Sequence, residues 1–178
     1  EDTSVAVTLS ATDAEDDVSA RRSAVRCSRP GTEASVFADG SLETVGTLPA
    51  RASDEPQYIL LEYEEPVTVR SATIRTGPGR NNHGGVLQVS SDGHSFRDVR
   101  GFRLPHGGNI PLPYVFSFPA ATGRYFRFLF SRFHPRYPWL RIAELRLHTE
   151  PRIDNVGGKA GFHRQPGLVP TTASTPED

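Results

Sequence analysis

The chain has 178 residues, which is enough for one compact hydrophobic core and cramped for two domains. Its 15 Pro and 16 Gly, together with 10 Phe, favour many short strands joined by turns. The formal net charge of −1 excludes a global field that would recruit nucleic acid or an anionic membrane.

The single cysteine, Cys27, excludes an internal disulfide and leaves the redox compartment open. No apolar run is long enough to cross a bilayer, and no basic-then-apolar signal segment stands at the start. Because the chain contains no Met, we expect it to be a piece of a longer precursor or an excised segment.

The pattern of the chain divides it into three parts. Residues 1–17 hold one short alternating run, which predicts a strand, and an acidic stretch that we interpret as a solvated linker. Residues 18–149 hold the patterned segments, although 18–35 are polar and only weakly patterned. Residues 150–178 are typical of a linker or tail, because Gly-Gly and Pro-Gly pairs and a Pro/Thr/Ser run replace any periodicity.

Two strands are predicted in the middle of the chain. Residues 58–63 form a short, nearly continuous apolar run, too brief for a helix. After a turn at 64–66, residues 67–74 alternate first in one phase and then in the other. That change of phase predicts a bulge or sharp twist near Arg70 and Ser71.

A hairpin and a further strand follow. Apolar residues at 87–89 and 96–99 flank Asp92-Gly93, and an Asp-Gly pair supplies the positive dihedral that a tight connection needs. Residues 114–118 then alternate as a strand, up to a Pro-containing break at 119–123.

The strongest strand signal is the run 124–130, which is echoed at 140–147. On an extended chain Phe126, Phe128 and Phe130 of the first run fall on the same side. With about eight strands and no helix, the sequence predicts an all-β protein, an antiparallel β-sandwich of jelly-roll type.

Four segments stand in an order that resembles a known fold. They are Phe37–Thr44, Gln57–Val67, Leu87–Phe96, and Gly123–Phe130 closing on Ala143–Leu145. Together they resemble the discoidin-like, galactose-binding-like sandwich, which the coagulation-factor C-type domains share with carbohydrate-binding module family 32. In addition, residues 150–162 resemble the segment that follows such a sandwich in α-L-rhamnosidases of glycoside hydrolase family 106.

The resemblance implies a structural calcium ion between the first loop and the last strand. The matching positions are Asp39, Thr44 and Glu144, and Ser41 stands where a second acidic residue is common. Calcium takes about six to eight oxygen ligands, so this departure lowers the charge of the site. The alternative is that Asp39 only forms a turn and that Glu144 pairs with an arginine.

In such modules sugars bind on loops at one end of the sandwich, through an aromatic ring and polar donors and acceptors. Two loops offer these groups, and the candidate residues are Arg80, Asn81, Asn82 and His83 in one and Arg132, His134, Arg136, Tyr137 and Trp139 in the other. Arg75, near a strand end, is a further candidate. The alternatives are that Trp139 fills the core, that His83 is merely solvated, or that these loops press against a catalytic domain.

Other function classes find less support. The sequence holds no metalloprotease, nucleophile-elbow or phosphate-loop motif, so we expect no catalysis within these residues. Arginines are frequent between 124 and 148, but alternation sends half of them to the opposite face, so we expect no nucleic-acid partner. A membrane partner is not favoured, because the collar of lysines expected for an anionic surface is missing.

The sequence therefore predicts a non-catalytic carbohydrate-binding or ancillary module of a larger, secreted or periplasmic glycoside hydrolase of the α-L-rhamnosidase type. Its expected partners are a polysaccharide or oligosaccharide and the catalytic domain of the parent enzyme. Two alternatives stay open: a structural interdomain spacer without ligand, and a discoidin-like phospholipid-binding domain.

Overall fold

A computed structural model describes residues 17–49, 56–79, 82–104, 113–133 and 139–152 of the chain. These ranges contain seven strands and two short 3-10 helices, η1 and η2. In chain order the elements are η1 (Val18–Arg21), β1 (Arg22–Cys27), η2 (Ala34–Phe37), β2 (Gly46–Pro49), β3 (Gln57–Thr76), β4 (Gly84–Ser90), β5 (Arg97–Arg103), β6 (Pro113–Arg132) and β7 (Trp139–His148). None of the helical turns in these ranges has the length and apolar character needed to cross a bilayer.

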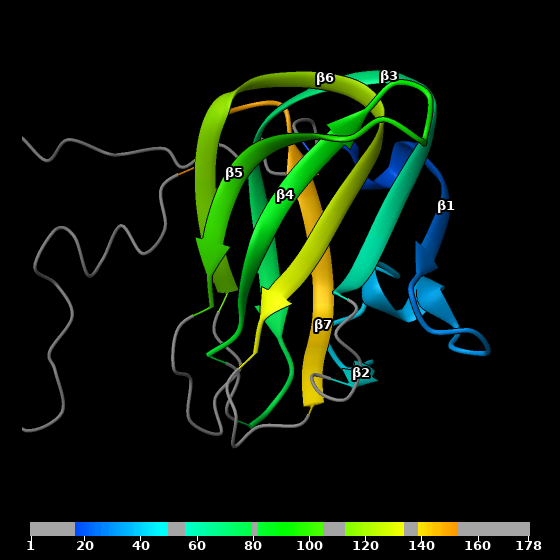
Figure 1. Ribbon diagram of the computed structural model, residues 1–178, viewed down its shortest axis with the longest axis vertical. Helices are drawn as coiled ribbons and strands as arrows, with labels where there is room; N and C mark the ends of the chain where they lie inside the picture. Colours follow the sequence, from blue (N-terminus) through cyan, green and yellow to red (C-terminus); the bar gives the residue numbers. More distant parts are fainter. Residues whose placement is uncertain (1–16, 50–55, 80–81, 105–112, 134–138, 153–178) are drawn as a thin grey trace, which may run out of the picture.

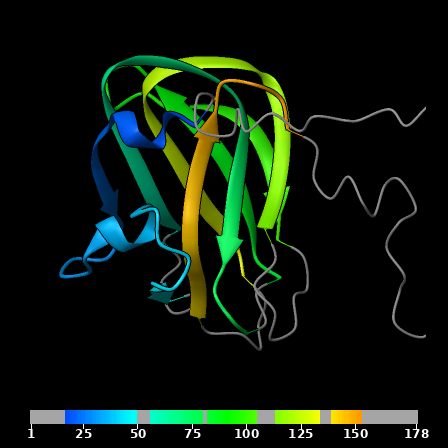
Figure 2. The ribbon, with the colours of Figure 1, turned by 180° about the vertical axis from the view of Figure 1, so that it is seen from behind.

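The strands form two layers, because β3 and β6 are long enough to bend and to take part in both (Figure 1). In one layer the first part of β3 pairs with β1 and with the second part of β6, and β4 and β5 continue the layer. In the other layer the second part of β3 pairs with the first part of β6 and with β7, beside which lies β2 (Figure 2). All of these pairs are antiparallel, which confirms the predicted all-β sandwich.

The bend of β3 corrects one prediction and agrees with another. The segment 64–66, predicted as a turn between two strands, lies within one continuous strand, and only the register with β6 shifts between Glu62 and Val67. The predicted irregularity near Arg70 is present as a second shift, between Val69 and Ser71. Likewise 119–123 does not break β6, because the chain bends there without leaving the sheet.

Sequence patterning failed for β1 and succeeded for the hairpin. Residues 22–27 form a strand at the edge of a layer, where a polar pattern with few apolar positions suffices. The hairpin of β4 and β5 is confirmed, and Gly93 adopts the positive φ of 77° that its turn requires.

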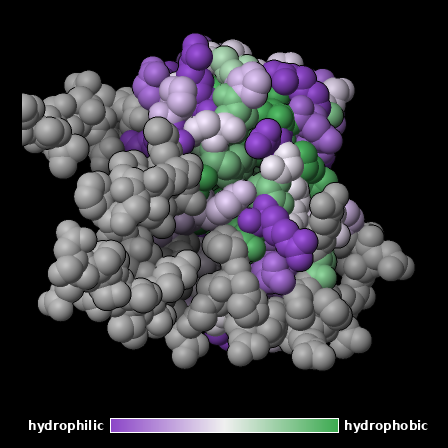
Figure 3. Space-filling view, turned by 90° about the vertical axis from the view of Figure 1, so that its left-hand side faces the viewer, coloured by the Kyte–Doolittle hydropathy of each residue, from purple (hydrophilic) through white to green (hydrophobic). Residues whose placement is uncertain are grey.

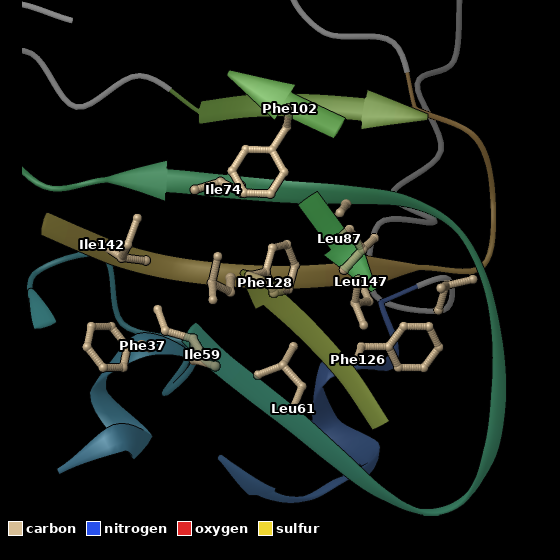
Figure 4. Close-up of a cluster of buried hydrophobic side chains, with 14 of the residues drawn as sticks. Phe37, Ile59, Leu61, Ile74, Leu87, Phe102, Phe126, Phe128, Ile142 and Leu147 are labelled. Carbon is tan, nitrogen blue, oxygen red and sulfur yellow. The ribbon is translucent and has the colours of Figure 1, made fainter. Parts of the chain in front are cut away.

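The core lies between the two layers (Figure 4). Phe126, Phe128 and Phe130 are fully buried, as their alternation predicts, and side chains such as Ile59 and Leu61 of β3 meet them. Phe37 of η2 is also fully buried, so the segment that precedes β2 is anchored in the same core.

The predicted domain boundaries stay a prediction, because most of 1–17 and of 150–178 lies outside the described residues. At the described margins, Asp17 forms an isolated β-bridge with His148. Ser71 Oγ donates a hydrogen bond to the carbonyl oxygen of Glu150, at 2.7 Å.

Candidate functional site

The segments predicted to bind sugar are flanked by strand ends that meet at one end of the sandwich, the lower end in Figure 1. The start of β4 lies beside the ends of β5 and β6, because Gly84 is opposite both Arg103 and Arg132. The start of β7 lies beside the end of β2, with Trp139 opposite Pro49. We call this end the rim.

Trp139 is exposed on the rim. It is the first residue of β7 and has an exposed fraction of 45%, whereas the next residue, Leu140, is fully buried. Trp139 therefore does not fill the core. Its ring is free to meet a partner, as the sugar-binding hypothesis requires, and its role in binding stays a prediction.

His83 contacts the backbone of Trp139 through a hydrogen bond. Its Nε2 lies 3.2 Å from the carbonyl oxygen of Trp139 and donates to it, and its ring lies 5.7 Å from that of Phe133. Its own carbonyl oxygen accepts a hydrogen bond from Leu104 N at 2.8 Å. Because His83 has no exposed surface, it is not merely solvated, and its assignment as a sugar ligand stays a prediction. It is a positioning residue for the rim.

Asn82, the residue before His83, contacts Arg103. Asn82 adopts a φ of 31°, a left-handed conformation that asparagine tolerates, and its Oδ1 accepts a hydrogen bond from Arg103 Nε at 3.2 Å. Arg103 is exposed at the end of β5. The sequence reasoning missed Arg103, since only the strand pairing brings the end of β5 next to the loop that holds Asn82.

Arg141 joins the rim from the same outward face of β7 as Trp139. Its Nη1 donates to the carbonyl oxygen of Pro78 at 3.2 Å, and its own carbonyl oxygen accepts from Gly77 N at 2.9 Å. A Cβ on Gly77 would lie 2.5 Å from Val45 Cγ1, so a larger residue there would require Val45 to shift. Arg141 was not predicted, although its spacing of two residues from Trp139 was a signal that pointed to it.

Arg75 belongs to another cluster. It is half-buried in β3, opposite Glu144 of β7, and it lines a hollow of about 180 Å³ together with Glu144, Arg146 and His148. The remaining predicted sugar ligands, Arg80, Asn81, His134 and Tyr137, lie outside the described residues, as does Arg136. Of Arg132 only the backbone, opposite Gly84, is described.

The residues predicted as calcium ligands do come together. Thr44 Oγ1 donates to Asp39 Oδ2 at 2.6 Å, and Glu144 Oε2 accepts from the backbone N of Gly40 at 3.0 Å. Glu144 is only 2% exposed. Burial raises the pKa of Glu144 above its ordinary value of 4.5, against the opposing effects of the Gly40 amide and of Arg146 and Arg22.

The groups around Glu144 nevertheless do not fit a calcium ion. Arg146 Nε lies 3.5 Å from Glu144 Oε1, and the guanidinium of Arg22 donates to the carbonyl oxygen of Ala38 in the same loop. Within the described ranges no three acidic, His or Cys side chains are grouped as metal ligands. Calcium prefers several oxygens and no cation beside it. The pairing of Glu144 with an arginine, the alternative to calcium, is present, and calcium itself stays a prediction.

Comparison with known proteins identifies the fold. No protein-family model matches the sequence, and no curated protein matches it. Many solved structures do match. The two-layered arrangement is that of an antiparallel β-sandwich. It is shared with carbohydrate-binding modules of family 32.

Three of these structures illustrate the likeness. The family 32 module of AlyQ in complex with 4,5-unsaturated mannuronic acid has 24% identity and a TM-score of 0.60, over 72% of this chain and 96% of that one. A Clostridium perfringens module in complex with GalNAc-β-1,3-galactose has 18% identity and a TM-score of 0.57, over 70% and 94%. A chitosan-binding module from Paenibacillus sp. IK-5 has 20% identity and a TM-score of 0.59, over 75% and 98%. At these identities the likeness is one of fold.

Proposed function

We propose that this protein is a non-catalytic carbohydrate-binding module that holds a polysaccharide or oligosaccharide on the rim. The observation that carries the proposal is Trp139, an exposed indole. Its backbone is fixed by the buried His83. An aromatic face packs against the apolar side of a pyranose ring, and surrounding donors fix the hydroxyl groups. Arg141 supplies such groups on the same face of β7. Asn82, the residue before His83, and its partner Arg103 supply others on the rim.

The neighbours in fold support this role. Their names describe modules bound to mannuronic acid and to GalNAc-β-1,3-galactose, and others that bind pectin or chitosan. The ligands differ widely, so the shared fold supports a carbohydrate partner without selecting the sugar.

The parent protein is part of the proposal. In one structure AlyQ carries its family 32 module together with alginate lyase domains. By analogy, we place this chain next to the catalytic domain of a larger secreted or periplasmic glycoside hydrolase. The α-L-rhamnosidase parent rests on the tail resemblance of residues 150–162, and no comparison supports it.

Affinity electrophoresis in gels that contain alginate, pectin or galactan tests the function. We expect at least one polysaccharide to retard the chain, and Trp139→Ala to abolish the retardation while lowering the melting temperature little, because the ring is half exposed. Leu42→Ala is the matched control, since Leu42 is a large apolar residue with 49% exposure outside the rim. Equal retardation of wild type and Trp139→Ala would contradict the proposal.

Two other outcomes would point to the alternatives. A chain that no glycan retards, and that stabilises an adjoining catalytic domain, would be a structural spacer. A chain that floats with phosphatidylserine vesicles in a density gradient would be a lipid-binding domain.

A further inference from the structure

β5 lies on the left of Figure 1, the side that faces the viewer in Figure 3, and residues of β5 line a cleft. Its volume is about 600 Å³, within the range of small-molecule sites, and β5 is the last strand of its layer. The residues that concern us here are Arg100, Gly101 and Arg103 of β5, Asp98 before them, and Tyr114 and Ser131 of β6. The described part of this face carries hydrophilic next to hydrophobic residues (Figure 3).

Two glycines line the cleft, and packing requires glycine at only one of them. A Cβ on Gly85 would lie 2.0 Å from the carbonyl oxygen of Leu129, so the packing of β4 on β6 requires glycine there. A Cβ on Gly101 would meet nothing nearer than the carbonyl oxygen of Gly85, at 3.9 Å, and Gly101 has no positive φ. Neither packing nor backbone conformation demands glycine at 101. A strand glycine costs about 0.5–1 kcal/mol relative to alanine. Such a residue often marks a bulge, or a place where a ligand or another backbone approaches closely, and the pairing of β4 with β5 shifts register nearby, between Leu87 and Gln88.

The charges of the cleft favour an anion. Asp98 is occupied, because its Oδ1 accepts a hydrogen bond from Gln88 Nε2 at 2.7 Å. Arg103 uses Nε for Asn82, which fixes the guanidinium at the mouth of the cleft. Arg100 is exposed, and its guanidinium has no hydrogen bond or ion pair to another residue in the described part of the chain. Arginines on an edge strand also prevent aggregation, but that role does not explain why residue 101 has no side chain.

We infer that this cleft binds an acidic sugar residue, a uronate, of the polysaccharide that the rim holds. The inference rests on the proposed function. Asn82 and His83 connect the two places, since Asn82 contacts Arg103 and His83 contacts both Leu104 and Trp139. A glycan that runs from Trp139 past His83 towards the end of β5 would bring a carboxylate to Arg100 and Arg103.

Binding of two forms of one polymer tests the cleft. Polygalacturonate carries a carboxylate on each sugar, and highly methyl-esterified pectin has most of them neutralised. We expect wild type to bind polygalacturonate at least tenfold more tightly than the ester, with the difference shrinking as salt rises. Gly101→Leu, which places a bulky side chain in the cleft, and Arg100→Gln should each remove this preference, while Arg97→Gln on the same strand keeps it. Melting curves show whether each variant is folded.

The outcomes separate the cleft from the rim. If Trp139→Ala abolishes binding while folded Gly101→Leu and Arg100→Gln keep the full preference for polygalacturonate, the cleft is overturned and the proposed function stands. Equal binding of the two polymers by wild type also overturns the cleft. If wild type binds no glycan at all, the proposed function fails as well.

A second inference concerns the loop that was predicted to hold calcium. The guanidinium of Arg22, on β1, donates to the carbonyl oxygen of Ala38, and its Nη1 is buried without a hydrogen-bond partner in the described ranges. Glu144 Oε1 is likewise buried without one. Arg22 lies near enough to Glu144 to oppose the rise of its pKa. A positive group therefore already stands between the loop and the last strand.

We infer that the Arg22 guanidinium is the resident cation of this loop and makes its folding independent of calcium. Ser41 agrees with this, since the second carboxylate that a divalent ion would need is missing. The melting temperature of wild type should be equal in calcium and in EDTA, and Arg22→Gln should lower it by about 5 °C. The double variant R22A/S41D should gain stabilisation by calcium. Arg26→Gln, on the same strand but with a side chain 67% exposed, is the control. Stabilisation of wild type by calcium, or a wild-type melting temperature for Arg22→Gln, would overturn the inference.

Discussion

The two ends of the sandwich use polar residues in opposite ways. At the end away from the rim, the turn between β4 and β5 is closed by its own side chains. Asp92 Oδ1 accepts from the backbone N of His94 and of Ser95, each at 2.8 Å, and from Ser90 Oγ at 2.8 Å. At the rim, the buried His83 holds the backbone of the exposed Trp139.

This difference separates residues that stabilise from residues that bind. In the turn, Asp92 Oδ1 already accepts hydrogen bonds from neighbouring residues, so it is not available to bind a partner. At the rim, the buried His83 fixes the backbone, so the Trp139 ring, Arg103 and Arg141 remain available to bind a partner. A substitution in the turn should change stability alone, and one on the rim should change binding.

The largest effect is expected between the ends, in the core that both share. Phe128 is fully buried between the layers, so Phe128→Ala should lower the free energy of unfolding by about 3–5 kcal/mol, through lost transfer energy and the cavity left behind. Urea denaturation measures it. A loss below about 1 kcal/mol would show that the layers do not pack through this ring.

His83 offers the next effect and sharpens the comparison. His83→Ala removes the donor to the Trp139 carbonyl, which should cost about 1–3 kcal/mol of stability and also weaken glycan binding, although His83 has no exposed surface. His83→Gln, which keeps a donor, should restore part of both. Calorimetric titration with the best glycan measures the binding. Unchanged binding in folded His83→Ala would separate His83 from the rim.

A substitution of Asp92 should change stability and leave glycan binding unchanged. The amides of Ser95 and His94 hold the pKa of the Asp92 carboxyl far below its usual range. Its stabilisation is therefore present above the unfolded pKa, about 3.9, and is lost as the pH falls through the lower folded pKa. Asp92→Asn should lower the melting temperature at neutral pH, flatten its fall in acid and leave glycan binding unchanged. Melting curves from pH 2 to 7 follow this, and a loss of glycan binding would break the comparison.

Glu144 should give the smallest effect, with the opposite sign. Because burial raises its pKa, its contribution to stability is present below the ordinary value of 4.5 and is lost as the pH rises through the folded pKa. Glu144→Gln should remove that decline while it keeps an acceptor for the Gly40 amide. The same melting series measures it. A steeper decline in the variant would show that the ionised form is the favoured one.

The sequence predicted those parts of the fold that burial makes periodic. Phe126, Phe128 and Phe130 face the core, so their alternation was legible. It did not predict that β3 and β6 each run through a proline-containing bend, because prolines usually end a strand, and a long curved strand that changes layers is visible only in the pairing.

The sequence predicted only some of the residues of the candidate site. The sequence pointed to Trp139 and Asn82, but it could not distinguish the exposed Trp139 from the buried His83, since both lie in Gly- and Pro-rich segments and exposure depends on long-range packing. Arg103 was missed because strand pairing, not sequence spacing, brings it next to Asn82. Arg141 was missed although its spacing of two residues from Trp139 places it on the same face of β7.

The most direct test uses the fact that Trp139 is the only tryptophan. A ¹H–¹⁵N spectrum therefore contains one indole N–H signal, which reports the rim, while the amide of Gly93 reports the opposite turn. On titration with a glycan that retards the chain, the account predicts that the indole signal shifts and saturates while that of Gly93 stays in place. A saturating shift at Gly93 with the indole unmoved would contradict it.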